Sequence, residues 1–266
     1  MDSPLWVEDL DSYPRPDGLE HFARRAFCRD YFAYKPGQHV VFGGASQHGK
    51  TSMAFDLIEY IVTPDFPAYL AQSKPRDPVT ERRSKELGFR TVSEWPPSTK
   101  IKEMALFGGQ KPSGYVVKIA FGNLRTDMER SAQVTSDLIM ERYASGASRK
   151  NQGGILLMDD TMVKAKIQGL DNQMVTILAM AGAMDLGLWT FVQKPTDSGR
   201  TTLWAYEQSD HMFLTSGGDE RMLKRYAEII GGDNGKIAMQ TIPTLKMYEF
   251  LYVDKPKGHM CVVGAS

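Results

Sequence analysis

The sequence has little cysteine, no long apolar run and no excess of charge of either sign. Cys28 and Cys261 are the only cysteines in 266 residues. Two thiols so far apart in the chain make neither a disulfide framework nor a zinc site, so we expect both to be small buried residues in a reducing compartment. No run reaches the ~20 apolar residues of a membrane span, and the acidic, proline-broken residues 1–16 have no secretory signal pattern. We expect an intracellular protein without a membrane span.

The charge balance excludes a protein that is basic or acidic throughout. Lys and Arg number 32, and Asp and Glu also number 32, so no global field favours nucleic acid or membranes and any contact with a polyanion must be local. The chain has no internal repeat and no low-complexity tract. Its length suits one domain, which we assign to residues 36–266, after a turn-rich N-terminal extension at residues 1–35.

Strand and helix patterns alternate along most of the chain. Short apolar runs predict strands at residues 39–44, 68–74, 90–95, 115–122, 155–160, 188–193, 210–216, 244–254 and 258–265. Helical periods and stop signals predict helices at residues 50–62, 77–89, 124–144, 171–187 and 218–232. This alternation predicts an α/β fold with a mostly parallel sheet flanked by helices on both faces. The last two strands are expected to form an antiparallel hairpin at the C-terminal edge.

A phosphate-binding loop follows the first predicted strand. Gly44, four residues, then Gly49, Lys50 and Thr51 match G-x-x-x-x-G-K-[ST], with a strand before and a helix after. Glycines let the backbone N–H groups curl around phosphate oxygens, and the helix N-terminus adds a favourable dipole. We expect Lys50 to reach the β- and γ-phosphates and the Thr51 hydroxyl to ligate Mg²⁺. The predicted nucleotide-binding residues are Gly44, Ala45, Ser46, Gln47, His48, Gly49, Lys50, Thr51 and Ser52.

A pair of carboxylates ends a later apolar strand. Ile155 to Met158 predict a strand buried on both faces, and Asp159 and Asp160 follow where its carboxyl end meets a ligand crevice. We assign Asp159 to Mg²⁺ coordination and Asp160 to polarising the attacking water. Many nucleotide-hydrolysing enzymes carry Glu at the second position, so the shorter Asp160 leaves contact through a water molecule open.

An amide ends the next apolar strand. The run "LWTFV" leads directly into Gln193. The chain order of phosphate loop, acidic strand and amide-tipped strand describes a sensor that hydrogen-bonds the γ-phosphate or the attacking water from between the other two strands. We therefore include Gln193, with Lys50 and Asp160, among the predicted catalytic residues.

Together these motifs resemble the FtsK–HerA superfamily of DNA-translocating ATPases. Members typically follow the acidic strand with a helix and a strand that ends in Gln-Arg-Pro or a similar tripeptide, and "VQKPTD" resembles it with Lys194 in place of Arg. Residues 31–51 and 210–232, the latter with an Asp-x-Arg-like segment, are also similar to the family. The resemblance covers Lys35 to about Gly232. It implies a RecA/ASCE-like P-loop NTPase that uses ATP and Mg²⁺.

The small size and short flanks look most like the viral branch of that superfamily, the genome-packaging ATPases of tailless double-stranded DNA viruses with an internal membrane. Such motors work as ring homo-oligomers on the backbone of double-stranded DNA, without reading its sequence. The resemblance implies ATP-driven packaging of a viral genome into a preformed capsid, with the ring size open. It also implies a capsid vertex protein as a partner, and a location in the host cytoplasm or on the virion.

A ring motor completes each site with a cation from the neighbouring subunit. Arg221, in the Asp-x-Arg-like segment, is the predicted catalytic arginine, and Arg200 and Arg149 are the alternatives. Arg149 and Lys150 also lie in a polar, glycine-containing loop whose composition suits contact with DNA phosphates. We interpret a second basic cluster, within residues 74–85, as a solvated helix face.

Two other functions remain as alternatives. A morphogenesis ATPase like those of filamentous phages would use ATP for virion extrusion, but those proteins carry a membrane span outside the ATPase domain. A small-molecule kinase would use the same phosphate loop, yet it needs an acceptor pocket and lid arginines and leaves Gln193 unexplained. A GTPase is not favoured, because the Asn-Lys-x-Asp motif that reads guanine is absent.

Overall fold

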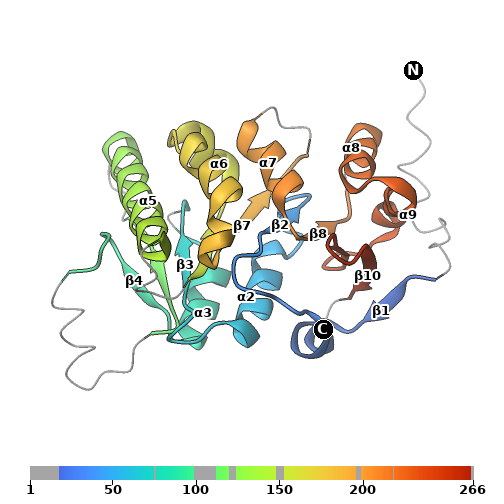
Figure 1. Cartoon of the computed structure of the whole chain (residues 1–266), viewed down its shortest axis with the longest axis horizontal. Helices are drawn as coiled ribbons and strands as arrows, with labels where there is room; N and C mark the ends of the chain where they lie inside the picture. The colour runs from blue at the N-terminus through green and yellow to red at the C-terminus, as the bar shows by residue number, and fades with distance from the viewer. Residues whose placement is uncertain are drawn as a thin grey trace.

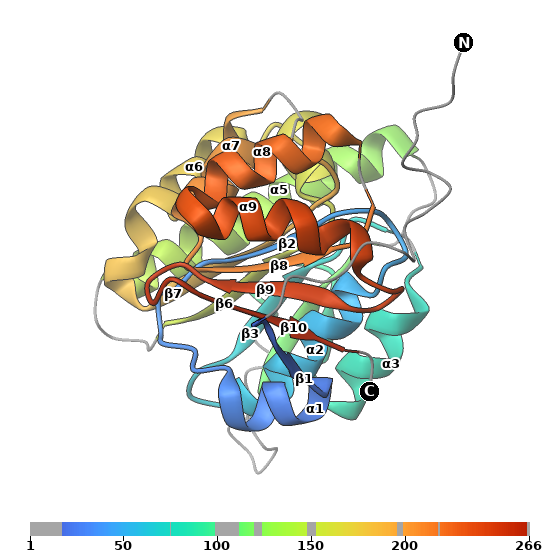
Figure 2. The same cartoon turned by 90° about the vertical axis from the view of Figure 1, so that its right-hand side faces the viewer.

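The computed structural model describes residues 18–74, 76–98, 112–119, 124–147, 153–195, 199–217 and 219–264. In these ranges the chain forms one ten-stranded sheet in the order β1-β10-β9-β8-β2-β7-β6-β3-β5-β4, with helices on both faces (Figures 1 and 2). The predicted α/β fold with a mostly parallel sheet is confirmed. Within the same ranges, no helix is long and apolar enough to span a bilayer.

The strands are short, and most neighbours run parallel. Their bounds are β1 Glu20–Phe22, β2 Val40–Gly43, β3 Ala68–Ala71, β4 Arg90–Val92, β5 Gly114–Val117, β6 Gly154–Met158, β7 Leu186–Val192, β8 His211–Thr215, β9 Phe250–Asp254 and β10 His259–Val263. From β8 to β4 each strand is parallel to the next, whereas β9 is antiparallel to both β8 and β10. The predicted C-terminal hairpin is thus confirmed, and β1 extends the sheet beyond it by parallel pairing with β10.

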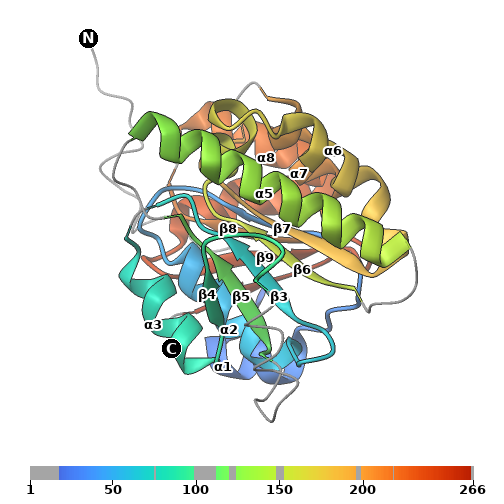
Figure 3. The same cartoon turned by 90° about the vertical axis from the view of Figure 1, so that its left-hand side faces the viewer.

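Helices cover the sheet as two layers. The α-helices are α1 Arg24–Ala26, α2 Lys50–Ile61, α3 Pro78–Glu86, α5 Leu124–Ala147, α6 Asp171–Met180, α7 Arg200–Gln208, α8 Glu220–Ile230 and α9 Gly232–Thr241. Shorter helical turns are η1 Phe27–Tyr31, η2 Val163–Ile167, η3 Ala181–Met184 and η4 Ile242–Thr244. Helices α5 to α9 lie on one face of the sheet, while α1, α2 and α3 lie on the other (Figures 2 and 3).

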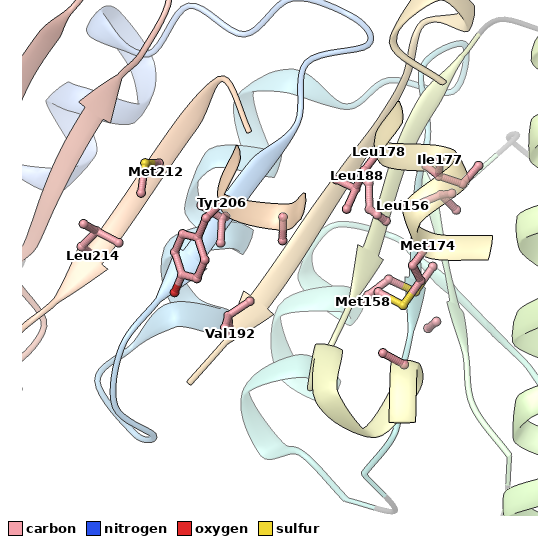
Figure 4. Close-up of a cluster of buried hydrophobic side chains, with 14 of the residues drawn as sticks. Leu156, Met158, Met174, Ile177, Leu178, Leu188, Val192, Tyr206, Met212 and Leu214 are labelled. Atoms are coloured by element: carbon pink, nitrogen blue, oxygen red, sulfur yellow. The ribbon is translucent and has the colours of Figure 1, made fainter. Parts of the chain in front are cut away.

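Burial on both faces explains why the strands are continuous apolar runs. Side chains alternate along a strand, so Leu188 and Val192 of β7 join the core under α6 and α7, while Trp189 and Phe191 join the core under α2. Figure 4 shows the first of these cores, where side chains of α6 and α7 meet those of β6, β7 and β8. Burying one large apolar side chain contributes about 1.5–3 kcal/mol to stability. The two cores therefore hold the sheet rigid, and the loops that follow its strands start from fixed positions.

Several elements differ from the sequence-based prediction, among them helix α7 (Arg200–Gln208), which lies where no helix was predicted. Helix α9 was not predicted, because Gly231, Gly232, Asp233, Asn234 and Gly235 have the composition of a loop; the helix forms because Ala238 and Thr241 are buried against the rest of the core. Strand β1 has no apolar alternation and exists through its pairing with β10. Strand β9 begins at Phe250, six residues after the predicted start at Thr244, because η4 and a turn occupy the intervening residues.

Candidate nucleotide-binding site

Three parallel neighbours bring the predicted motifs to one edge of the sheet. Strand β7 lies between β2 and β6, and its residues Thr190 and Val192 pair with Met158 of β6 and Gly43 of β2. The loops that follow these strands therefore leave the sheet side by side. The prediction that the Gln193 strand lies between the phosphate-loop strand and the acidic strand is confirmed.

The phosphate loop needs glycine at two positions. Gly44 has φ +119°, and a Cβ there would lie 2.1 Å from Thr215 Oγ1 on β8. Its N–H donates to the Val192 carbonyl at 3.1 Å, which ties the loop to the end of β7. Gly49 has φ +84° immediately before the first residue of α2. Only glycine adopts these left-handed conformations without strain, so the loop curls around the N-terminus of α2 as predicted.

The Lys50 ammonium sits inside this curl. Its Nζ donates to the carbonyls of Gly44 and Ala45, each at 2.6 Å. The pKa of Lys50 is lowered to about 8, chiefly by burial and also by the nearby charge of Lys74, while Asp160 acts in the opposite direction. A poorly hydrated cation held by carbonyl oxygens is suited to accept an anion in their place.

A cavity of about 640 Å³ opens at this edge of the sheet. The lining residues are Ser46, Gln47, Gly49, Lys50, Thr51, Ser52, Lys74, Arg76, Asp77, Pro78, Val79, Asp159, Asp160, Phe191, Gln193 and Tyr248. The structure therefore places the predicted Lys50, Thr51, Asp159, Asp160 and Gln193 around one space. The volume is in the range of pockets that hold a small organic ligand.

Asp159 is half-buried and well held. Its Oδ1 accepts a hydrogen bond from the Ser73 N–H at 2.6 Å, and the Ser73 hydroxyl donates to the Asp159 carbonyl at 3.3 Å. Burial raises the pKa of Asp159, while the cation of Lys164 and the bonds from Ser73 oppose the rise. Lys164 itself is fully buried on η2, with its Nζ donating to Thr135 Oγ1 at 3.1 Å. The acidic strand end thus has a buried counter-ion behind it.

Asp160 and Thr161 turn the chain away from the sheet. Asp160 has φ +45°, a left-handed conformation that is uncommon for a residue with a side chain, and its Oδ1 accepts from the Val163 N–H at 3.4 Å. The buried Thr161 hydroxyl oxygen accepts from the Phe191 N–H at 3.0 Å. This turn keeps Asp160 at the cavity and links the acidic strand to the strand that carries Gln193.

The donor set fits Mg²⁺ held partly by nucleotide phosphates. Thr51, Asp159 and Asp160 all offer oxygen atoms to the cavity, and oxygen is the ligand that Mg²⁺ prefers. Within the described ranges, no three His, Cys, Asp or Glu side chains gather into a site that could hold a metal alone. Mg²⁺ commonly uses one or two protein ligands with water and substrate phosphates, and this arrangement is suited to that mode.

No protein-family model and no curated protein matches this sequence. The genome packaging NTPase B204 from Sulfolobus turreted icosahedral virus 2, in complex with AMPPCP, is similar in structure with TM-score 0.56 and 15% identity, covering 88% of this chain and 100% of that chain. VirB4 of Thermoanaerobacter pseudethanolicus gives TM-score 0.59 and 7% identity over 86% and 89% of the two chains. The cytoplasmic domain of the type VII secretion ATPase EccC of Thermomonospora curvata gives TM-score 0.51 and 8% identity, and the match covers 90% of this chain and 26% of that chain.

These three structures share the fold of this chain. The fold is that of a P-loop NTPase. At identities of 15% and below the likeness concerns the fold, which the sequence motifs had indicated. What this fold does in the present protein follows from the residues of this chain.

The predicted arginines lie in different surroundings within this fold. Arg221 is exposed in the first turn of α8 and does not line the cavity. The loop before α8 reaches the phosphate loop, since a Cβ on Gly217 would lie 3.6 Å from the Ala45 Cβ. Arg200 is bound within its own chain by Asp171 at 3.1 Å and by Asn172. Arg149 and Lys150 lie outside the described residues.

The second basic cluster divides into two parts. Arg83 is bound by Asp56 at 2.9 Å and Glu59 at 3.0 Å on α2, which pins α3 against the helix of the phosphate loop. Lys74 and Arg76 instead line the cavity beside the phosphate loop. Sequence reasoning assigned them to a solvated face; the signal that could have separated them is that Lys74 lies just beyond a strand end.

Tyr248 is a cavity residue for which the sequence holds no signal. It has φ +70°, is exposed, and its Cδ1 would lie 2.9 Å from a Cβ on Gly49. Its carbonyl accepts a hydrogen bond from the buried Arg24 guanidinium. Arg24 also pairs with Asp56 of α2 at 3.5 Å. A residue that precedes the C-terminal hairpin therefore forms one wall of the cavity, held by a residue near the N-terminus.

Proposed function

We propose that this protein is an ATP-driven translocase of double-stranded DNA that works as a ring oligomer and packages a viral genome. One observation carries the proposal: the neighbouring parallel strands β2, β6 and β7 each lead to predicted catalytic residues, and these residues line one cavity. They are Lys50 after β2, Asp159 and Asp160 after β6, and Gln193 after β7. The similar fold of a genome packaging NTPase, solved with AMPPCP, supports it.

The residues divide the work of hydrolysis among them. Lys50 binds the β- and γ-phosphates from within the curled loop, and Thr51 and Asp159 hold the cation. When bound, Mg²⁺ neutralises charge on the phosphate oxygens. Asp160 takes a proton from the attacking water, whose oxygen bonds to the γ-phosphorus while the bond to the β–γ bridging oxygen breaks. ADP leaves with that oxygen and its electron pair, and Gln193 orients the water and the γ-phosphate.

Ring assembly and DNA contact belong to the same proposal. Arg221 is exposed in the first turn of α8 and does not line the cavity of its own subunit, so its role in the proposal is to supply a cation to the site of a neighbouring subunit. Balanced overall charge, with 32 basic and 32 acidic residues, fits a local contact with the DNA backbone inside a ring. A capsid vertex protein is the proposed further partner, and the host cytoplasm the proposed location.

The test is ATP turnover by the purified protein with and without linear duplex DNA. The Lys50→Ala variant serves as the control, and a sizing run at the same protein concentration reports assembly. Turnover that DNA stimulates, that Lys50→Ala abolishes and that accompanies a ring supports the proposal. ATP turnover by a monomer that DNA does not stimulate contradicts the proposal and favours a phage-assembly ATPase or a small-molecule kinase.

A further inference from the structure

Two cations in the cavity have no role in the proposal above. Lys74 and Arg76 lie on the loop between β3 and α3 and line the cavity together with Lys50, Asp159 and Asp160. Both side chains are exposed. Among the described residues, neither has an ion-pair partner within 4.0 Å. An unpaired basic pair in a cavity that already holds a phosphate loop is suited to an anionic ligand there.

The loop that carries these cations is anchored at both ends. At its start, the Ser73 N–H donates to Asp159 Oδ1 at 2.6 Å, and the Gln72 amide donates to the Lys74 carbonyl at 2.7 Å. At its end, the Asp77 side chain caps α3 by accepting from two backbone N–H groups at 3.1 and 3.2 Å. Lys74 thus follows directly after a residue bonded to the acidic strand end, and its backbone is fixed relative to Asp159.

Lys50 follows β2 and Lys74 follows β3, and strand β6, which the acidic pair follows, lies between these two strands in the sheet. Both lysines line the same cavity. Two ammonium groups in one cavity repel each other until an anion enters between them. The γ-phosphate of a nucleotide on the phosphate loop is such an anion.

We propose that Lys74, assisted by Arg76, contacts the terminal phosphate of the nucleotide bound by its own subunit. The proposal rests on the ATPase function proposed above and deepens it, because it assigns part of the transition-state charge stabilisation to a cis residue rather than to a neighbour's arginine alone. As the bond between the γ-phosphorus and the bridging oxygen breaks, charge accumulates on oxygens that a fixed cation is positioned to stabilise. ADP lacks the phosphate that Lys74 contacts.

Binding of ATP and ADP to Lys74→Ala, measured by calorimetry, tests this assignment. We expect the affinity for ATP to fall about tenfold, the size of a lost charged hydrogen bond, while the affinity for ADP stays within about twofold. Lys74→Arg keeps the cation and should keep most of the ATP preference. Lys85→Ala is the matched control, since Lys85 lines a separate cavity between α3 and the sheet. An unchanged ratio of ATP to ADP affinity in Lys74→Ala overturns the proposal.

Mixing the two single variants, with the turnover of each variant alone as the baseline, separates a cis role from a trans role. When Lys50→Ala is mixed with Lys74→Ala, a cis role predicts no recovery of ATP turnover, because every subunit with Lys50 lacks its own Lys74. Recovered turnover would show that Lys74 serves the neighbouring site and would overturn the proposal. If the unaltered protein binds no ATP, the proposed function fails and this inference with it. If the unaltered protein hydrolyses ATP but DNA does not stimulate the reaction, the proposal of DNA translocation is wrong. The ratio of ATP affinity to ADP affinity in Lys74→Ala still decides the role of Lys74.

Discussion

The backbone N–H of Phe191 donates a hydrogen bond to Thr161 Oγ1 at 3.0 Å, between two buried residues. Phe191 lies two residues before Gln193, and Thr161 directly follows Asp160. One bond therefore sets the position of the amide relative to the carboxylates. Removing the hydroxyl while keeping the shape removes this bond together with the 3.5 Å bond that the hydroxyl donates to the Met158 carbonyl.

Thr161→Val should lower both stability and turnover. A buried N–H left without an acceptor costs ~1–3 kcal/mol, so urea denaturation should show a loss of that size in the free energy of unfolding. The turnover number should fall while nucleotide affinity stays near that of the unaltered protein, because Gln193 is displaced and the phosphate loop is not. Thr176→Val is the matched control, an exposed threonine of α6 whose hydroxyl donates to the Asn172 carbonyl. Equal effects of the two variants would contradict the assignment.

Gln193→Ala should separate hydrolysis from binding. Loss of one positioned donor in a catalytic site typically costs about 10²–10³ in turnover, and Gln193 lines the cavity without being part of the phosphate loop. We expect single-turnover hydrolysis to slow by that factor, with ATP affinity changed by no more than a few fold. Lys194→Ala, at the exposed next residue, should behave like the unaltered protein. A loss of ATP affinity equal to the loss of rate would argue against a sensor role.

Arg24→Met should loosen one wall of the cavity. The Arg24 guanidinium donates to the Tyr248 carbonyl, pairs with Asp56 at 3.5 Å, and lies over the Phe250 ring at 5.4 Å. Charged hydrogen bonds contribute ~1.5–3 kcal/mol, and we expect a stability loss of that size in urea. Nucleotide affinity should also fall, because Tyr248 lines the cavity.

Arg25→Met controls for the loss of charge in that segment, since Arg25 is exposed. It should leave both stability and nucleotide affinity unchanged. A variant at Arg24 with unaltered nucleotide affinity would show that the Tyr248 wall does not depend on this arginine.

His211 should make the protein less stable in acid. It is buried on β8, its ring nitrogens bond the Tyr252 hydroxyl at 2.8 Å and Gln38 Oε1 at 3.0 Å, and burial lowers its pKa from 6.5 to about 4. Between these two values the unfolded chain binds more protons than the folded one, so the free energy of unfolding falls as pH decreases through the window. One such shift corresponds to roughly 3 kcal/mol in total.

Urea denaturation from about pH 7 to about pH 4 measures this dependence. The unaltered protein should lose stability more steeply than His211→Gln. His259→Gln is the control, because that ring is only partly buried. Parallel curves for the unaltered protein and His211→Gln would contradict the account.

The parts of the site that sequence predicted are those set by local pattern and by the rule that parallel strands end together. The phosphate loop, Asp159 and Gln193 each follow an apolar run, so the sequence alone is enough to predict their common edge. Lys74 also follows a strand end, but its place beside Asp159 depends on β3 pairing with β6. Such a pairing between distant segments leaves no mark in the composition of either strand.

Tyr248 is a second cavity residue whose position could not be predicted from the sequence. It reaches the phosphate loop because β9 pairs antiparallel with β8, which in turn lies next to β2. The turn before β9 is therefore brought back to the edge where β2 ends. Helix α9 was missed for a related reason, because its glycine-rich start has the composition of a loop and only burial of its later residues stabilises it as a helix.

The central claim is that ATP bound at Lys50 drives movement along duplex DNA. Displacement of a third strand from a triplex on linear DNA measures such movement directly, independently of turnover. The account predicts displacement that requires ATP and the unaltered protein, and none with Lys50→Ala or with a nonhydrolysable analogue. ATP hydrolysis that DNA does not stimulate and that leaves the third strand in place would contradict it.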